Sequence, residues 1–469
     1  FIIGIVYMST KKLVVLGGGP GGYAAAFLAA DKGMDVTLID AGKKPGGVCL
    51  HRGCIPSKAL LHIAHLINET KEAKAWGVDF GDPKIDLDAV RNWKDQVIDK
   101  MATGLVQLCK QRKVEFVSGK GMFKDSQTIE VDGKSFSFDH CVLATGSRPI
   151  QPFQNNSHLI DSTDALDLES IPEKLLIVGG GYIGLEMGSV YATLGSQVTI
   201  VEMMDGLLTG VDRDLVRPLQ HRIKNQFKAI LLNTRVTEIK QAESKTHVTL
   251  ENESGTEKKV FNRVLVSVGR APNTDGLGLE NTKVKLNEKG FVIADSQQKT
   301  DDSQISAIGD VIGGAMLAHK AAHEAKVAVE VIDGESSDFN NRIIPAVVFT
   351  DPEIAWAGLT ETEALAQGRK VSIAKFPWGA SGRAQTLGRG EGMTKLIIDP
   401  ESEKIVGVGL TGAGVGELIA EGVLAIESGM KAKDLALSIH PHPTLSETLM
   451  EAADVFYGTA THIHKRKRN

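Results

Sequence analysis

The sequence has few cysteines, little net charge and no segment typical of a membrane span, and each absence excludes a class of protein. Four cysteines in 469 residues are too few for a disulfide-stapled secreted scaffold, so we expect a cytoplasmic location. A net charge of −5 gives no general affinity for nucleic acid or an anionic membrane. The apolar start, residues 1–7, is too short to span a bilayer and lacks the basic region of a signal peptide.

The two ends of the chain carry no catalytic motif. The stretch Met8-Ser9-Thr10-Lys11 reads like a protein start, so we expect residues 1–7 to be an extension without function. Residues 464–469 are rich in Lys and Arg. Such a tail is either a solvated end or a docking element for an acidic partner.

Glycine, by contrast, is abundant, with 50 residues, and it marks an internal repeat. The first copy is an apolar strand, Lys12–Leu16, followed by a Gly-rich turn, Gly17–Gly22. A helical stretch (23–32) and a second strand (36–39) follow, ending at Asp40. This order of strand, turn, helix, strand and acid is the context that the dinucleotide fingerprint requires.

The second copy has the same order. Strand 175–178 leads into Gly179-Gly180-Gly181-Tyr182-Ile183-Gly184, then a helix over 185–194 and a strand over 198–201 that ends at Glu202. One such motif alone is weak evidence, but two in the correct context are strong. The sequence therefore predicts two nucleotide sites, each with a helix N-terminus facing the pyrophosphate.

Two cysteines, Cys49 and Cys54, follow the first fingerprint closely. A regular helix holds Cα atoms five residues apart at about 8–9 Å, whereas a disulfide needs less than about 7 Å. The backbone must therefore be distorted if the sulfurs bond, and Gly53 could permit it. A strained pair beside a nucleotide site is typical of a reactive disulfide. We expect Cys109 and Cys141 to be buried packing groups.

Two nucleotides and one dithiol indicate an electron relay. The first site directly precedes the cysteines, so we assign it to FAD, and the second to a nicotinamide cofactor. Glu202 favours NAD, because a carboxylate there repels the 2′-phosphate of NADP.

Thiol–disulfide exchange needs a thiolate, and therefore a general base. His442 with Glu447 offers an imidazole oriented by a carboxylate. The alternative is structural: Thr444 as a helix N-cap with Glu447 as its capping-box partner. Lys58 is similarly open, since it could stabilise a reduced flavin or be a solvated lysine.

The remaining pattern is coarser. Largely apolar runs ending in glycine, at 141–146, 264–269 and 305–309, suit buried parallel strands. Residues 67–111 have an amphipathic helical pattern and are interpreted as an insertion. From about Ile344 we expect antiparallel strands (347–350, 370–376, 394–398) and helices (417–427, 444–453). This part lacks a nucleotide motif, so we expect it to make subunit contacts.

Together these motifs resemble the flavin-dependent pyridine nucleotide–disulfide oxidoreductases, and within them the dihydrolipoamide dehydrogenases. The resemblance extends from Lys11 to about Tyr457. Its motifs are residues 46–61, 144–149, 268–273, 307–310, 316–321, 349–353 and 442–447. The sequence departs from the commonest pattern at His51 and Arg52, where asparagine and valine often stand.

The resemblance implies an α/β fold with two Rossmann-like domains, which bind FAD and NAD, and a C-terminal α+β dimerisation domain. Residues 8–150 and 276–345 would form the two parts of the FAD-binding and central region. Residues 151–275 would bind NAD, and residues 346–469 would form the interface domain.

The resemblance also implies residue roles. Cys49 would attack lipoamide and Cys54 would lie next to the flavin, while His442, held by Glu447, would act as acid–base on the thiols of the partner subunit in a homodimer. The His442–Pro443 bond would be cis. The implied FAD contacts are Gly17, Gly19, Gly22, Asp40, Gly121, Asp310 and Ala318. Lys58, paired with Glu186, would lie beside the flavin. The implied NAD contacts are Gly179, Gly181, Gly184, Glu202, Val236, Gly269 and Arg270, and Thr145 and Gly146 are further implied cofactor contacts.

The implied partners are lipoyl domains and the multienzyme core of 2-oxo acid dehydrogenase complexes, with the glycine cleavage H protein as a further candidate. No metal, nucleic acid or membrane partner is expected. One alternative is a glutathione-type reductase that uses NADPH, which Glu202 argues against. A second is a mercuric reductase, which would add a C-terminal cysteine pair. The third is a non-catalytic flavoprotein used in assembly, which predicts loss of a catalytic residue, whereas all the expected catalytic residues are present.

Overall fold

The computed structural model describes residues 10–153, 157–242, 245–340 and 343–464. The chain divides into two compact units, the first formed by residues 1–59, 86–150 and 269–341 and the second by residues 60–85, 151–268 and 342–469. The expected extension at residues 1–7 and residues 465–469 of the basic tail lie outside the described residues. Among the described helices, none combines the length and apolar character needed to cross a membrane.

The first unit is built on a five-stranded parallel sheet in the order β18-β7-β1-β2-β3. Side chains of β1 alternate between its faces, as a strand requires. Leu13 and Val15 pack on the helical side, and Val14 and Leu16 on the opposite side. The strands are β1 (Lys12–Leu16), β2 (Asp35–Asp40), β3 (Glu115–Ser118), β7 (His140–Leu143) and β18 (Ile305–Ala307).

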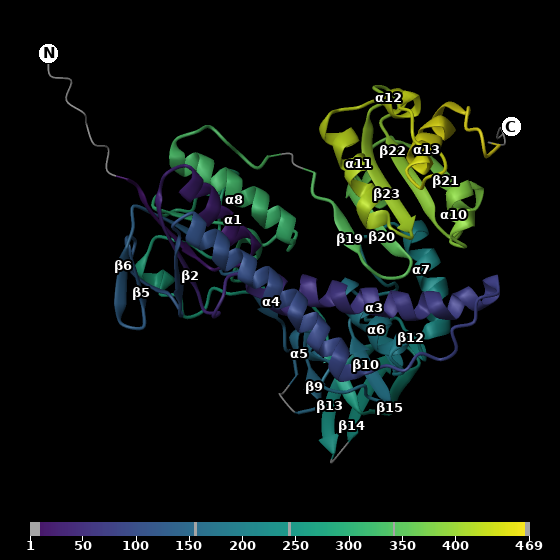
Figure 1. Ribbon diagram of the computed structural model, residues 1–469, viewed down its shortest axis with the longest axis horizontal. Helices are drawn as coiled ribbons and strands as arrows, with labels where there is room; N and C mark the ends of the chain where they lie inside the picture. Colours follow the sequence, from purple (N-terminus) through teal and green to yellow (C-terminus); the bar gives the residue numbers. More distant parts are fainter. Residues whose placement is uncertain (1–9, 154–156, 243–244, 341–342, 465–469) are drawn as a thin grey trace. The chain divides into compact units, whose positions relative to one another are not determined.

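Two helices, α1 (Pro20–Asp31) and α8 (Ala318–Asp333), pack side by side on one face of this sheet (Figure 1). Their close contact depends on small residues: a Cβ on Gly21 of α1 would lie only 3.1 Å from the Cβ of Ala321. The other face is covered by a three-stranded antiparallel sheet. Further elements of this unit are α2 (Gly47–Arg52), α4 (Leu87–Gln111), β4 (Met122–Asp125), β5 (Thr128–Val131), β6 (Lys134–Ser137), β8 (Ser147–Pro149), β17 (Arg270–Pro272), η2 (Leu279–Asn281) and η3 (Gly309–Ile312).

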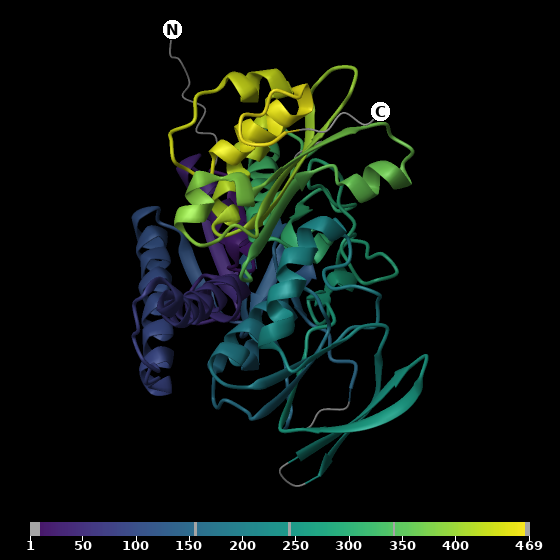
Figure 2. The same ribbon diagram turned by 90° about the vertical axis from the view of Figure 1, so that its right-hand side faces the viewer.

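The second unit repeats the parallel arrangement in the order β12-β11-β10-β16-β9. One face packs against an antiparallel sheet, β13-β14-β15, the long teal strands of Figure 2. The elements are α3 (Cys54–Glu72), which begins in the first unit, η1 (Ala73–Trp76), β9 (Leu159–Ile160), α5 (Ser162–Asp167), β10 (Lys174–Val178), α6 (Tyr182–Thr193), β11 (Gln197–Val201), α7 (Arg213–Gln226), β12 (Ala229–Leu231), β13 (Arg235–Ala242), β14 (Lys245–Asn252), β15 (Gly255–Phe261) and β16 (Arg263–Val266).

The C-terminal part of the second unit is an antiparallel sheet in the order β19-β20-β23-β22-β21. Its core includes the fully buried Trp378, whose Nε1 donates to Thr394 Oγ1 at 3.0 Å. The elements are β19 (Ala346–Val348), β20 (Glu353–Gly358), α9 (Glu361–Ala366), β21 (Ser372–Pro377), η4 (Trp378–Ala380), α10 (Gly382–Thr386), β22 (Met393–Ile398), β23 (Ile405–Gly412), α11 (Val415–Glu427), α12 (Ala432–Leu437) and α13 (Glu447–Tyr457).

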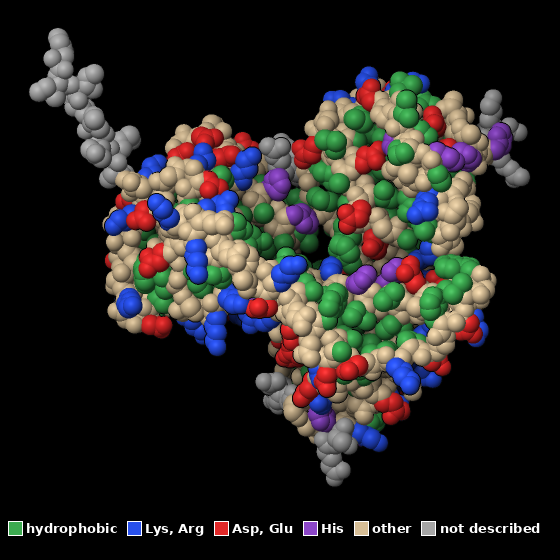
Figure 3. Space-filling model, in the orientation of Figure 1, with side chains coloured by type: hydrophobic (Ala, Val, Ile, Leu, Met, Phe, Trp, Pro, Cys, Tyr) green, Lys and Arg blue, Asp and Glu red, His purple; other side chains and the backbone are tan. Residues whose placement is uncertain are grey.

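The predicted fold class is confirmed: two parallel α/β sheets and an antiparallel C-terminal part with helices. Three details differ. The helical pattern over 67–111 is broken between Trp76 and Leu87, where Gly77, Gly81 and Pro83 lie. The two three-stranded sheets were not predicted, and α13 begins at residue 447 rather than 444. The domain boundaries stay a prediction. On the face shown in Figure 3, acidic and basic side chains are intermixed.

Candidate active site

The first Gly-rich turn opens α1 and leaves its N-terminus facing open space. Gly17 has φ +111°, and a Cβ there would lie 2.2 Å from the Ala144 carbonyl oxygen. A Cβ on Gly22 would lie 1.7 Å from the Gly17 oxygen, so the third glycine allows the helix to approach the strand. A Cβ built on Gly19 would lie 4.0 Å from Gly47 Cα, the nearest atom apart from its chain neighbours and the backbone of the helix itself. No side chain caps the N-terminus of α1. This is the division of roles that a dinucleotide turn requires.

The second turn, at the start of α6, repeats this arrangement. Gly179 also has φ +111°, and its Cβ would lie 2.5 Å from the Ser267 oxygen. A Cβ on Gly184 would lie 2.3 Å from the Gly179 oxygen. A Cβ built on Gly181 would meet no atom within 4 Å apart from its chain neighbours and the backbone of its own helix. The N-terminus of α6 also lacks a side-chain cap. Both turns therefore fit a pyrophosphate group at a helix N-terminus.

The acids at the ends of β2 and β11 brace these turns. Asp40 accepts from the backbone N–H of Gly18 at 2.5 Å, and Glu202 from that of Gly180 at 2.7 Å. The second oxygen of each acid accepts from the N–H two residues further along, at 2.7 and 2.8 Å. A carboxylate has about four acceptor positions, so each acid retains capacity for ribose hydroxyls.

Asp310 belongs to a network in the first unit that sequence reasoning did not find. Ser147 Oγ donates to Asp310 Oδ2 at 2.5 Å and accepts from Arg270 Nε at 2.7 Å. Arg270 also donates to the Ser147 carbonyl oxygen at 2.7 Å. Ser147 directly follows the Thr145-Gly146 motif, which is the only signal that could have drawn attention to it.

Arg270, Gly269 and Val236 were expected at an NAD site. The guanidinium of Arg270 lies beside Asp310, an expected FAD contact, with Nε at 4.0 Å from the carboxylate. Val236 is buried in the core between β13 and the parallel sheet, so its side chain has a packing role. A Cβ built on Gly269 would lie 3.4 Å from Ile150 Cδ1, so the glycine leaves room for the Ile150 side chain. Their roles toward NAD stay predictions.

The other expected FAD residues differ in kind. Gly121 is required for packing, because a Cβ there would lie 2.6 Å from Leu16 Cδ1. Thr145 Oγ1 donates to the Asn273 carbonyl oxygen at 2.8 Å, while Gly146 has φ +71° and open space around it. Ala318 is the first residue of α8, whose N-terminus has no side-chain cap.

The cysteine pair lies where two helices meet at a distortion. Helix α2 ends at Arg52 and α3 begins at Cys54, with Gly53 between them at φ −150° and ψ −111°. A Cβ on Gly53 would lie 3.0 Å from the Val48 carbonyl oxygen. The backbone is thus distorted at Gly53, as a bond between the two sulfurs would require, and the redox pairing of Cys49 with Cys54 stays a prediction.

The start of α2 contacts the first nucleotide turn directly. The N–H of Gly46 donates to the Gly18 carbonyl oxygen at 2.7 Å. A Cβ on Gly47 would lie only 2.5 Å from Gly19 Cα. The helix that carries Cys49 is thus fixed to the turn that is expected to hold a cofactor.

Cys49 and Cys54 are both thiols in this structure. The hydrogen bond with Cys54 and burial raise the pKa of Cys49, and the nearby charge of Lys58 opposes that rise. Burial raises the pKa of Tyr23, and the two thiols add to it, so Tyr23 of α1 is a neighbour of the pair that sequence reasoning missed. Cys109 and Cys141 are buried, as predicted.

His442 and Glu447 form the predicted pair. His442 Nδ1 lies 2.9 Å from Glu447 Oε1, and the imidazole is 71% exposed. The other oxygen of Glu447 accepts from the Thr444 N–H at 2.7 Å. Partial burial opposes ionisation of Glu447, but these two hydrogen bonds outweigh it and lower its pKa. The His442–Pro443 bond is cis, as expected.

Glu186 is buried on α6, and one of its oxygens accepts from the Phe349 N–H at 3.1 Å. Lys58 belongs to the first unit and Glu186 to the second, so their pairing stays a prediction. The same holds for the approach of His442 to the thiols.

Comparison with known protein families identifies the family to which the chain belongs. Residues 11–325 match the family model described as "Pyridine nucleotide-disulphide oxidoreductase", and residues 344–453 match the dimerisation domain of the same family. The chain belongs to the pyridine nucleotide–disulphide oxidoreductase family. It is therefore an oxidoreductase of the class that its motifs resemble.

Several curated relatives of this oxidoreductase are similar over nearly their whole length. It is 46% identical to the dihydrolipoyl dehydrogenase of Vibrio cholerae, covering 97% of this chain and 98% of the relative. It is 44% identical to that of Haemophilus influenzae, with 97% of each chain covered. Among solved structures, LpdA from Mycobacterium tuberculosis has a TM-score of 0.88 at 27% identity, covering 95% of this chain and 99% of that one.

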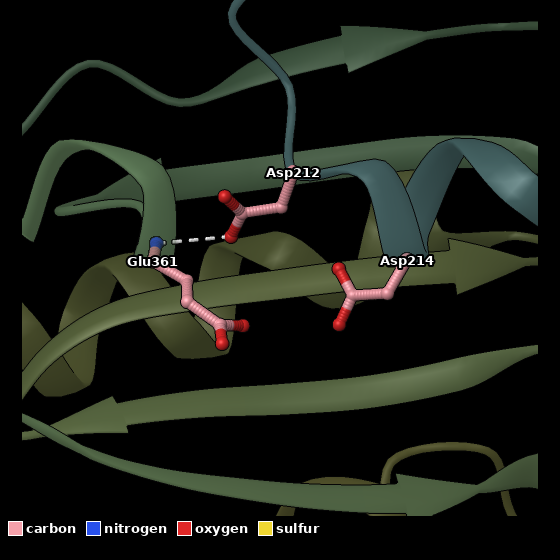
Figure 4. A group of neighbouring side chains, drawn as sticks. All are labelled: Asp212, Asp214 and Glu361. Carbon is pink, nitrogen blue, oxygen red and sulfur yellow. Dashed lines mark hydrogen bonds between the residues drawn. The ribbon is translucent and has the colours of Figure 1, made fainter. Parts of the chain in front are cut away.

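One acidic cluster in the second unit of this oxidoreductase lies apart from these motifs. Asp212, Asp214 and Glu361 place carboxylate oxygens within 4.8 Å of one another (Figure 4). The ammonium of the buried Lys395 lies among them, at 2.6, 2.8 and 3.2 Å respectively. Lys375 adds a second ammonium, 2.7 Å from Asp214 and 3.2 Å from Glu361. Two lysines therefore oppose the charge of the three acids, and the cluster is an ion-pair network around the buried Lys395.

Proposed function

We propose that this oxidoreductase oxidises protein-bound dihydrolipoyl groups with NAD, through the Cys49–Cys54 couple and FAD. One observation carries the proposal: the helix with Cys49 is fixed to the first nucleotide turn by the Gly46–Gly18 hydrogen bond. Electron transfer from a dithiol to a cofactor needs this proximity. The names of the curated relatives supply the substrate class.

The chain's residues have distinct roles in this proposal. In the oxidised enzyme, Cys49 would be attacked by a substrate thiolate. The mixed disulfide would then be resolved by the second substrate thiol, leaving Cys49 and Cys54 as thiols and the substrate as a disulfide. When bound, the two cofactors supply two-electron chemistry, a flavin by accepting an electron pair and a nicotinamide by accepting a hydride.

His442 would accept the proton of the substrate thiol. Glu447 holds its Nδ1, which leaves Nε2 as the basic nitrogen when the ring is neutral. We propose that His442 acts on the thiols of a partner subunit in a homodimer, which the match to a dimerisation domain supports.

The proposed cofactor preference rests on Glu202. Its carboxylate, at the end of β11, accepts from the Gly180 N–H of the second turn, and an acid at this point of a dinucleotide fold disfavours a 2′-phosphate. We propose NAD for this reason. The proposed partners are lipoyl domains, the core of 2-oxo acid dehydrogenase complexes and the glycine cleavage H protein, and the proposed location is the cytoplasm, where a redox pair can cycle.

The test is an assay of the purified holoenzyme with dihydrolipoamide and either NAD or NADP. We expect rapid turnover with NAD and at least about tenfold lower kcat/KM with NADP, since a repulsion of about 1.4 kcal/mol suffices. Cys49→Ser should lose dihydrolipoamide oxidation yet retain flavin and NADH oxidation by ferricyanide. Cys109→Ser, which replaces a buried thiol, is the matched control and should keep full activity.

Full dihydrolipoamide oxidation by Cys49→Ser would contradict the proposal. If the wild-type enzyme does not oxidise dihydrolipoamide but reduces glutathione disulfide with NADPH, the proposed substrate class and the proposed preference for NAD are both wrong. A protein that binds flavin and reacts with neither substrate would favour a non-catalytic role.

A further inference from the structure

The segment between α12 and α13, residues 438–446, carries His442. Its first part is exposed, and Ile439 is 98% exposed. Only 7% of the His440 side chain is exposed, and further along Leu445 packs against the C-terminal core. His440 is thus an inward-facing side chain two residues before His442.

Both ring nitrogens of His440 are paired. Nδ1 lies 2.8 Å from the Ser438 carbonyl oxygen, and Nε2 lies 2.7 Å from Glu421 Oε1 on α11. A carbonyl oxygen and a carboxylate both accept hydrogen bonds, so each ring nitrogen has an acceptor within hydrogen-bond distance. The ring is thereby tied both to its own segment and to α11.

This pairing gives His440 a different role from its neighbour. His442 has Nδ1 held by Glu447 and exposes its ring. Both ring nitrogens of His440 already have partners within the chain, so its side chain is placed to hold the segment rather than to meet a substrate. It does tie the segment to α11, while Thr444 ties the far end, donating through Oγ1 to the Pro441 oxygen at 2.7 Å.

We propose that His440 is a positioning residue: its hydrogen bond with Glu421 holds the segment 438–443 on α11, and so fixes where His442 lies. The inference rests on the proposed function, because it concerns the same acid–base. A displacement of about 1 Å can cost about 10²-fold in rate. Loss of this hydrogen bond should therefore lower the rate of the step that uses His442.

The experiment compares His440→Ala, Glu421→Ala and His440→Gln in the holoenzyme. We expect kcat for dihydrolipoamide oxidation to fall between about 10-fold and 10²-fold in the two alanine variants, with KM changed less than about twofold. NADH oxidation by ferricyanide, which does not need His442, should be unchanged. His440→Gln keeps one donor for Glu421 and should recover part of kcat. Glu417→Ala, an exposed carboxylate one turn earlier on α11, is the control.

A double-mutant cycle separates positioning from general damage. If His440 acts through His442, adding His440→Ala to His442→Gln should not lower kcat further. An additive loss, or a wild-type kcat in His440→Ala, would overturn the inference.

Hydrogen exchange tests the inference without any substrate. The backbone amides of residues 438–446 should exchange faster in His440→Ala than in the wild type, and those of α11 should not. Unchanged exchange in that segment would also overturn it. If the wild type fails to oxidise dihydrolipoamide, the proposed function falls, while the exchange measurement still decides the role of His440.

Discussion

Glu447 shows how one carboxylate can hold two groups at once. One of its oxygens accepts from the Thr444 N–H and the other holds His442. The helix begins at Glu447 itself, with Ser446 as its N-cap and no side-chain cap, so the structural interpretation, in which Thr444 is the N-cap, is wrong. The catalytic role of the pair stays a prediction.

Removing the imidazole should affect the chemistry and leave the fold intact. His442→Gln keeps a similar volume on an exposed position, so flavin content and thermal stability should match the wild type. The kcat for dihydrolipoamide oxidation should fall by about 10²–10⁴-fold, as for other positioned acid–bases. Steady-state kinetics across pH measure this, and a variant with wild-type kcat would remove His442 from the mechanism.

At this scale the sequence predicts residues that belong to local motifs. Cys49, Cys54, His442 and the fingerprint glycines were found because their chemistry depends on spacing along the chain. Ser147 was not found, because its importance comes from Asp310, far away in the sequence. A serine has no local signature that distinguishes such a role.

At the scale of elements, the two nucleotide turns use each glycine differently. In α6 the third glycine is required by packing, since its Cβ would lie 2.3 Å from a carbonyl oxygen. A Cβ built on the middle glycine, Gly181, would meet no atom within 4 Å apart from its chain neighbours and the backbone of its own helix. Packing within the described chain therefore does not require glycine at position 181.

This difference predicts opposite phenotypes for two alanine variants. Gly184→Ala should destabilise the protein by about 1–3 kcal/mol, through overpacking against the Gly179 oxygen. Gly181→Ala should keep the wild-type melting temperature and raise KM for NAD at least about tenfold, a loss of about 1.4 kcal/mol of binding. Thermal unfolding and NAD titrations separate the two. Equal stability losses would show that Gly181 is also a packing residue.

Elements with strong patterns were predictable, and short strands without an apolar run that ends in glycine were not. The strand–turn–helix repeats were found because glycine spacing and apolar runs agree there. The strands of β4-β5-β6 have only four residues each, too few for a reliable alternation. Their burial depends on the parallel sheet that they cover, which only the folded chain reveals.

At the scale of the molecule, the Lys395 network joins the nucleotide-binding and antiparallel parts of the second unit. Lys395 lies on β22, whereas Asp212 precedes α7 and also accepts from the N–H of Glu361 at 3.0 Å. Burial opposes the charge of Asp212, but hydrogen bonds from Lys395 and Thr362 outweigh it and lower its pKa to about 2.

The lowered pKa of Asp212 predicts a pH-dependent stability. A depressed carboxyl pKa stabilises the fold above the ordinary value of 3.8, and this contribution is lost as pH falls toward about 2. Asp212→Asn should therefore cost about 3 kcal/mol near pH 7, because it removes one partner of a buried ion pair. Urea unfolding across pH checks this. The difference from the wild type should shrink between pH 4 and 2, and a constant difference would refute the assignment.

The bracing of both turns by Asp40 and Glu202 has a consequence for affinity. Each loop is ordered by hydrogen bonds to an acid of the chain itself. A ligand bound there would therefore cost little backbone entropy at the loop, which is what preorganisation means for a receptor. The ordering cost is met once, during folding, and each proposed nucleotide would meet a loop of fixed shape.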